Sequence, residues 1–208
     1  MTVLAQRALL AACTAVLAGG VAAQFAQSTD PVFPLRYFSA DSALLCSIAC
    51  AASLAWPSSR CAWFARGMST VGVVVSAIVY AAIIAPASAT GTWFQPWDDG
   101  WVRTAIVLMH GVGPALATAQ FLVLPGPPAR DLATAALWCA WPAGYLVATI
   151  GLAVLVGIPI PYPFLDPHAM GGPPAVLAAV LAIGLANFVV GLVLLRGRKL
   201  VRSERRTT

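Results

Sequence analysis

Residues 101–124 read WVRTAIVLMHGVGPALATAQFLVL, an apolar run long enough to cross a bilayer, with a histidine near its middle. An ionisable side chain is costly in hydrocarbon, so His110 is expected to face the protein interior and to mark a functional site. Pro114 has no N–H to donate to the carbonyl of His110, and Gly111 and Gly113 loosen the same turn. We therefore predict a kink beside a small polar cavity. The alternative is a packing kink whose histidine bonds a neighbouring helix.

The composition around this run excludes a soluble globular protein. Of 208 residues, 60% are hydrophobic and only 9% are charged, and the mean hydropathy is +0.85. Soluble domains carry about 25% charged residues. Apolar runs and short connectors take up nearly the whole chain, so we predict one all-α membrane domain, an integral bundle of six transmembrane helices. The expected spans are approximately 5–27, 37–56, 66–85, 101–124, 132–156 and 174–195.

Two of these spans carry further signals. The first contains Val21-Ala22-Ala23, which looks like a signal-peptidase site, but the apolar stretch exceeds the roughly 7–15 residues of the hydrophobic region of a signal peptide. A retained helix is therefore favoured over a cleaved signal. Pro142 predicts a kink in the fifth span. Gly72 with Ser76, and Gly144 with Ala148, are small residues at helical spacing that would allow close helix packing.

The positions of the basic residues predict the orientation. With both termini cytoplasmic, ten basic residues fall inside and two, Arg36 and Arg103, fall outside, as the positive-inside rule expects. The net charge of +5 is thus explained by topology, including the basic tail at 196–208, rather than by nucleic acid. A specific interaction of this tail with anionic lipid is the lesser alternative. We expect a multi-pass protein of a bacterial inner membrane, with membrane lipids as partners. The ten inside residues are Arg7, Arg60, Arg66, Arg130, Arg196, Arg198, Lys199, Arg202, Arg205 and Arg206.

The five cysteines do not form a disulfide pattern. Four of them, Cys13, Cys46, Cys50 and Cys139, fall inside apolar segments, and Cys61 falls in a predicted cytoplasmic loop. They are interpreted as buried small hydrophobic residues. No metal or cofactor is expected, because the chain has two histidines in different environments and no carboxylate cluster.

The start of the second span allows two interpretations of Ser39. In the first, Ser39 caps a helix N-terminus and Asp41 complements the helix dipole. In the second, Ser39 is a nucleophile and His110, the one histidine in an apolar span, is its base. At 1.5 Å per residue, His110 lies about 13 Å below the start of its span, deeper than Ser39. Their proximity is therefore a prediction, not a deduction.

Three short patterns together resemble a known family. The chain contains Tyr37-Phe38-Ser39-x-x-Ser42, then His110-x-x-x-Pro114, then Tyr162-Pro163-Phe164-Leu165-Asp166. In this order they resemble the androgen-induced membrane protein family, and most closely its bacterial Pr-six-Pr branch. The last pattern is the most specific of the three.

The resemblance implies a six-helix membrane hydrolase without metal. Animal members of the family cleave fatty acid esters of hydroxy fatty acids with a threonine and a histidine, which correspond to Ser39 and His110 here. Bacterial relatives have asparagine where this chain has Ala43, and the departure puts activity in question if that amide positions substrate.

The expected chemistry is acyl transfer from a lipid ester that enters from the bilayer. Asp41, Tyr145, Tyr162 and Asn187 are predicted to contact substrate, with Tyr145, Thr149 and Asn187 as candidate oxyanion donors. Two alternatives stay open: a small-molecule transporter or channel lined by His110, Tyr145 and Asn187, and a non-catalytic membrane scaffold. His168 lies in a loop and is not expected to be catalytic.

Overall fold

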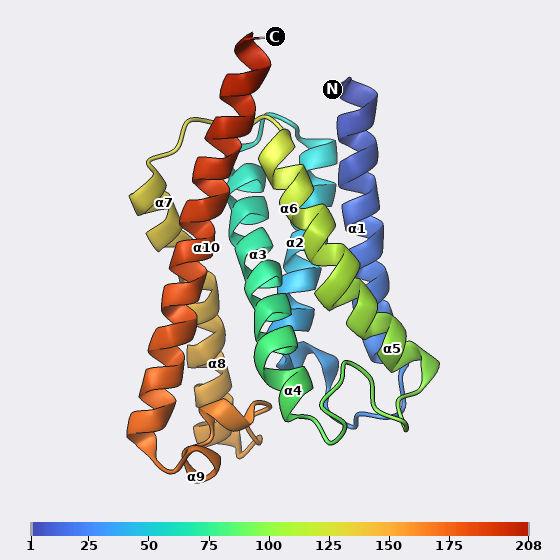
Figure 1. Ribbon diagram of the computed structural model, residues 1–208, viewed down its shortest axis with the longest axis vertical. Coiled ribbons are helices and arrows are strands. Elements are labelled where there is room, and N and C mark those ends of the chain that lie inside the picture. Colours follow the sequence, from blue (N-terminus) through green and yellow to red (C-terminus); the bar gives the residue numbers. More distant parts are fainter. Residues whose placement is uncertain (1, 208) are drawn as a thin grey trace.

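The computed structural model describes residues 2–207, without the side chains of 202 and 204–207. Helices make up 79% of the chain, and the described residues contain no strand. Six helices are long and apolar enough to cross a membrane, which is the architecture of a multi-pass membrane protein. Both termini lie at the same end of the bundle, here called the terminal end (Figure 1). The opposite, distal end carries the connectors around residues 27–37, 88–99 and 157–172.

The spans are built from ten α-helices with short irregular turns. Helices α1 and α2 each form one span. The third span consists of α3 and α4, the fourth of α5 and α6, and the fifth of α7 and α8. The short helix α9 comes before the last span, which is α10. The bounds are α1 Val3–Ala26, α2 Phe38–Ala55, α3 Arg60–Val79, α4 Ala85–Ala87, α5 Gly100–Ile106, α6 Gly113–Val123, α7 Asp131–Trp138, α8 Ala140–Val156, α9 Pro167–Met170 and α10 Pro173–Thr207.

The start of the third span differs from the prediction. Arg66 was expected to open this span and Cys61 to lie in a loop, but α3 already begins at Arg60. The Ser59 side chain accepts the N–H of Ala62 at 3.2 Å, so the short connector itself supplies the helix cap. Arg66 consequently lies within the helix and is only 4% exposed.

The predicted kink at Pro114 is confirmed and takes the form of a π-helical turn over Val107–Val112. Because Pro114 cannot donate to the turn before it, the N–H of Gly113 bonds the carbonyl of Leu108, one residue further back than in an α-helix. A Cβ at Gly113 would collide with that carbonyl and with the Leu17 side chain of α1. The absent side chain therefore lets α1 pack against the irregular turn.

The fifth span is also broken, as Pro142 predicted. Helix α7 ends at Trp138 and α8 begins at Ala140, because the ring of Pro142 cannot donate a hydrogen bond to the Trp138 carbonyl. Helix α8 has no buried residue, and Val154 and Leu155 are 76% and 84% exposed. Such large exposed apolar side chains are expected to face lipid.

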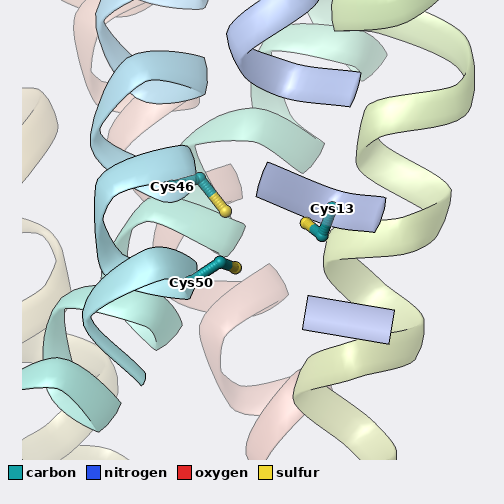
Figure 2. Close-up of side chains that lie close together, drawn as sticks. All are labelled: Cys13, Cys46 and Cys50. Carbon is teal, nitrogen blue, oxygen red and sulfur yellow. The ribbon is translucent and has the colours of Figure 1, made fainter. Parts of the chain in front are cut away.

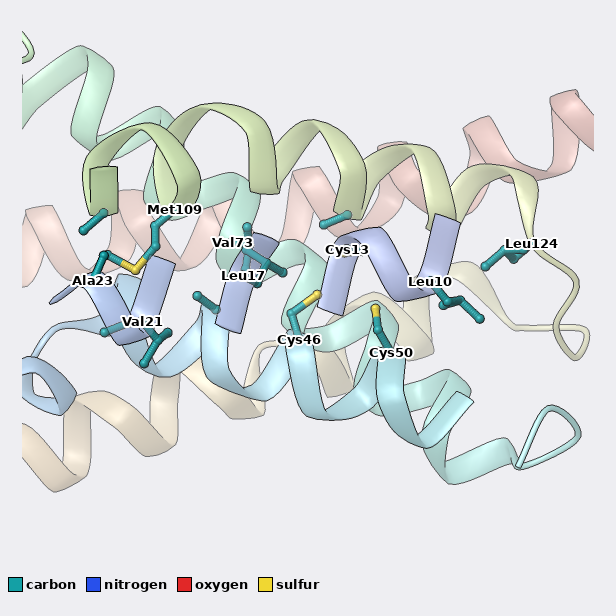
Figure 3. Packing of buried hydrophobic residues seen from close by; sticks show 14 residues of the cluster. Leu10, Cys13, Leu17, Val21, Ala23, Cys46, Cys50, Val73, Met109 and Leu124 are labelled. Atoms are coloured by element: carbon teal, nitrogen blue, oxygen red, sulfur yellow. The ribbon is translucent and has the colours of Figure 1, made fainter. Parts of the chain in front are cut away.

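Buried side chains form two clusters. The first fills the space between α1, α2, α3 and the fourth span, and includes Leu17, Cys46 and Met109 (Figure 3). The second surrounds Trp138 and joins α3, α6, α7 and α10. The two clusters leave α3 in the centre of the bundle, where it contacts both.

The small residues predicted to mediate packing behave differently from one another. Gly72 lies against α2, since a Cβ there would approach Ser42 Oγ to 2.7 Å. A Cβ added at Gly144 would meet no atom of a neighbouring helix within 4 Å among the described residues, so the expected close packing at this residue is wrong. Its helix, α8, lies at the edge of the bundle, where no neighbour covers that face.

Candidate functional site

His110 lies in the π-helical turn, near the middle of the fourth span. Its ring stacks on the ring of Tyr80, with centroids 4.2 Å apart and an interplanar angle of 20°. Tyr80 begins a second π-helical turn, Tyr80–Ile84, and donates its hydroxyl to the Trp93 carbonyl at 2.7 Å. The His110 Nδ1 atom is buried and has no hydrogen-bond partner among the described residues. Such turns often occur at functional sites, and an unpartnered buried nitrogen is available to a ligand.

A cavity of about 370 Å³ opens at the distal end beside this histidine. It lies between the ends of the third and fourth spans and the connector that follows α1. Tyr80, which stacks on His110, and Ile106, one turn before it, belong to its wall. The remaining lining residues are Thr29, Asp30, Pro31, Ile84, Ala85, Ser88, Trp93, Gln95, Trp97, Asp98 and Val102.

Ser39 lies in the first turn of α2 and does not cap it. The capping position is Tyr37, whose side chain makes no cap hydrogen bond, and the helix begins at Phe38. The Phe38 N–H instead donates to the hydroxyl of Tyr162 at 2.9 Å. A residue remote in the sequence thus supplies the cap, and the interpretation of Ser39 as a capping residue is wrong. Asp41 does lie in the first turn, as predicted.

The connector after α8 folds over this helix start. Tyr162 packs edge to face on Tyr37 at 5.9 Å and stacks on Phe164 at 4.9 Å. Burial of its hydroxyl, together with the nearby Tyr145 hydroxyl, raises the pKa of Tyr162 well above its ordinary value, although the backbone N–H groups of α2 oppose the shift. Tyr145 donates to the Arg36 carbonyl at 2.6 Å. The predicted substrate contacts Tyr145 and Tyr162 therefore gather at the start of α2.

Ser39 and His110 belong to two different groups of side chains. Within residues 2–207 no hydrogen bond joins them. The helix that carries Ser39 nevertheless packs directly against the π-helical turn that carries His110. The structure thus brings the two elements together but does not form the predicted nucleophile–base hydrogen bond.

Asn187 does not join the predicted substrate contacts. It is 1% exposed on α10, and its side-chain nitrogen donates to Ile183 of the same helix at 2.8 Å. Among the described side chains, none of the other predicted site residues is hydrogen-bonded to it. Its Oδ1 atom is buried and has no hydrogen-bond partner among the described residues.

The structure also shows groups that the sequence analysis missed. Tyr80 was not singled out, because its contact with His110 depends on two π-helical turns that face each other. Three of the cysteines, interpreted as separate packing groups, lie together in the core (Figure 2). The buried Arg66 is close enough to interact with them electrostatically. The spacing of Cys46 and Cys50, one helical turn apart, was the one available signal, and nothing in the sequence tied Cys13 to them.

We compared the chain with known proteins. No family model, no curated protein and no solved structure matches the chain.

Proposed function

We propose that the protein is an intramembrane hydrolase of lipid esters, with Ser39 as nucleophile and His110 as base. One observation carries the proposal: a buried histidine with an unpartnered nitrogen lies on an irregular turn packed against the helix that begins beside Ser39. An ionisable group at this depth is expensive to maintain without a role. The family resemblance of the sequence motifs points to the same pair.

The reaction is a two-step acyl transfer. His110 removes the proton of the Ser39 hydroxyl while Ser39 Oγ bonds to the ester carbonyl carbon. The bond between that carbon and the alcohol oxygen breaks, and His110 returns the proton to the departing alcohol. Water then cleaves the acyl-serine, which frees the fatty acid and restores the hydroxyl.

The two side chains must come within hydrogen-bond distance for the first step, so α2 and the π-helical turn have to shift when substrate binds. Catalytic hydrogen bonds are often longer in the free enzyme and shorten in the substrate complex. Tyr145, Tyr162 and Asp41 surround the start of α2 and would contact the ester group or its alcohol part.

Labelling of the purified protein with a fluorophosphonate tests the proposal, together with turnover of a long-chain acyl ester of p-nitrophenol. The variants are Ser39→Ala and His110→Ala. Ser53→Ala and His168→Ala are matched controls. Ser53 bonds the Ala49 carbonyl of its own helix at 2.8 Å, and His168 is exposed in the short helix α9, not in a loop as expected.

The proposal expects labelling that disappears in Ser39→Ala, falls about 10²–10⁴-fold in rate in His110→Ala and persists in both controls. Absence of labelling in the unaltered protein, or persistence in Ser39→Ala, would contradict it. Solute flux through liposomes that contain the unlabelled protein would then indicate a channel or transporter, and the absence of both activities a scaffold.

A further inference from the structure

Three cysteine thiols converge inside the bundle, away from the Ser39 and His110 groups. Cys13 comes from α1, and Cys46 and Cys50 lie one turn apart on α2. All three are 0% exposed, and their sulfur atoms lie within 4.8 Å of one another. Figure 2 shows Cys46 and Cys50 directed from α2 toward Cys13, which faces them from α1. The fold therefore presents three sulfur atoms to one common point.

A buried guanidinium accompanies the thiols. Arg66 of α3 is 4% exposed and lies close enough to Cys13, Cys46 and Cys50 to interact with them electrostatically. Its Nη2 makes one long hydrogen bond, 3.5 Å, to the Pro125 carbonyl, and its Nε is buried without a partner.

This positive charge lacks a carboxylate counterion, since none pairs with Arg66 among the described side chains. An unpaired buried charge is strongly unfavourable, and in hydrocarbon the cost is higher still. The acidic groups beside the guanidinium are the three thiols. Negative charge carried by this set of sulfur atoms would offset the charge of Arg66.

We propose that Cys13, Cys46 and Cys50 form a binding site for a monovalent copper ion, coordinated by three sulfur atoms. Thiolates are soft ligands that select Cu(I), whereas Mg²⁺ and Ca²⁺ require oxygen. Metal–sulfur bonds of about 2.3 Å, the length found for zinc thiolates, place three sulfur atoms about 4 Å apart in a trigonal arrangement. The observed sulfur positions therefore need only a small contraction.

The donor set distinguishes copper from zinc. Structural zinc sites take four protein ligands. In the described part of the chain the gathered ligands are three sulfurs, without a histidine or carboxylate among them. A three-coordinate monovalent ion fits such a set. A polar neighbour, the Thr70 hydroxyl at 4.0 Å from Cys46 Sγ, is an oxygen donor, which Cu(I) does not favour.

Binding is an exchange of protons for metal without electron transfer. Cu⁺ enters, each cysteine that coordinates as a thiolate releases one proton, and copper remains monovalent. The Arg66 guanidinium offsets part of the negative charge that the thiolates bring into the core. A disulfide is a poorer account of the cluster, because it would join only two of the three sulfur atoms that lie within 4.8 Å of one another.

The test uses the full chain, purified in detergent and kept reduced and anaerobic. Cu(I) is titrated in competition with the chromophoric chelator bicinchoninate, and Zn(II) is titrated separately. Variants Cys13→Ser, Cys46→Ser and Cys50→Ser each remove one ligand. Cys61→Ser and Cys139→Ser are matched controls, because Cys61 is exposed and Cys139 donates to the Ala135 carbonyl of its own helix.

We expect one copper per chain in the unaltered protein and in both controls. Each ligand variant should weaken binding by more than the roughly 10–100-fold that the loss of an outer-shell partner costs, and Arg66→Gln should fall within that range. X-ray absorption of the copper-loaded unaltered protein should show three sulfur neighbours, a readout that depends on no variant. Failure to hold copper against the chelator, equal retention in the ligand variants, nitrogen or oxygen neighbours, or a preference for zinc would each overturn the proposal.

Discussion

The tyrosine that caps α2 allows a quantitative test of the distal architecture. Tyr162→Phe removes the hydroxyl that accepts the Phe38 N–H at 2.9 Å but keeps the ring that packs on Tyr37 and Phe164. The lost hydrogen bond is worth about 0.5–1.5 kcal/mol, and an N–H left buried and unpaired costs about 1–3 kcal/mol. We therefore expect a loss of about 1–3 kcal/mol in the free energy of unfolding.

Reversible unfolding in mixed micelles, by titration with sodium dodecyl sulfate and detection by circular dichroism, measures this loss. Tyr80→Phe is a matched control, because it removes a hydroxyl bonded to the Trp93 carbonyl, away from α2. Tyr145→Phe should couple with Tyr162→Phe, since the two hydroxyls lie together, and a double-mutant cycle should give about 0.5 kcal/mol or more.

Alkaline pH gives a second measurement on the same residue. The pKa of folded Tyr162 lies above that of the unfolded chain, because burial disfavours the phenolate. Its contribution to stability is therefore complete below pH of about 10 and is lost as pH rises above that value. Tyr162→Phe should lessen this alkaline loss. Unchanged stability of the variant at neutral pH, or an equal alkaline loss, would refute the assignment of the buried cap.

Three further predictions concern packing, the distal connectors and the core. Gly67→Ala would drive a Cβ into the Trp138 indole and should destabilise the protein by about 1–3 kcal/mol. Gly144→Ala, with open space around the added Cβ, should change stability little. Equal effects of the two substitutions would contradict the packing of Gly67 against Trp138. Backbone N–H groups of the connector after α1 and of α5 hold the pKa of Asp99 below its ordinary value, so stability should fall as pH drops below about 4. In an acid titration followed by circular dichroism, Asp99→Asn should abolish this pH dependence. Persistence of the dependence in the variant would contradict the assignment. Gln120→Leu removes a buried hydrogen bond to an α3 hydroxyl and should cost about 0.6–1.7 kcal/mol in micelle unfolding; a stabilised variant would contradict this.

The fold class followed from the sequence because the lipid environment leaves few choices. A backbone in hydrocarbon must satisfy its own hydrogen bonds, so long apolar runs with few charges become helices whatever their neighbours are. Pro114 and Pro142 likewise produced the predicted breaks, since a proline ring disrupts a helix through local geometry alone.

Helix starts were harder to predict where the capping group belongs to a distant part of the chain. Ser39 has the residue type of a cap, yet Tyr162, far along the chain, bonds the first N–H of α2. Arg66 looked like a residue at the membrane boundary because it is charged, but Ser59 starts the helix earlier and carries Arg66 into the core. Local sequence preferences cannot predict a helix start whose hydrogen-bond partner lies in a remote part of the chain.

The sequence by itself determined the number of spans, their approximate limits and the breaks at Pro114 and Pro142, because each depends on hydropathy and local backbone chemistry. Only the tertiary structure decided that His110 stacks on Tyr80 and that Cys13 meets Cys46 and Cys50. These contacts depend on how helices rotate and pack against one another. Small and apolar side chains on every face of a membrane helix leave that rotation undetermined until the whole bundle is assembled.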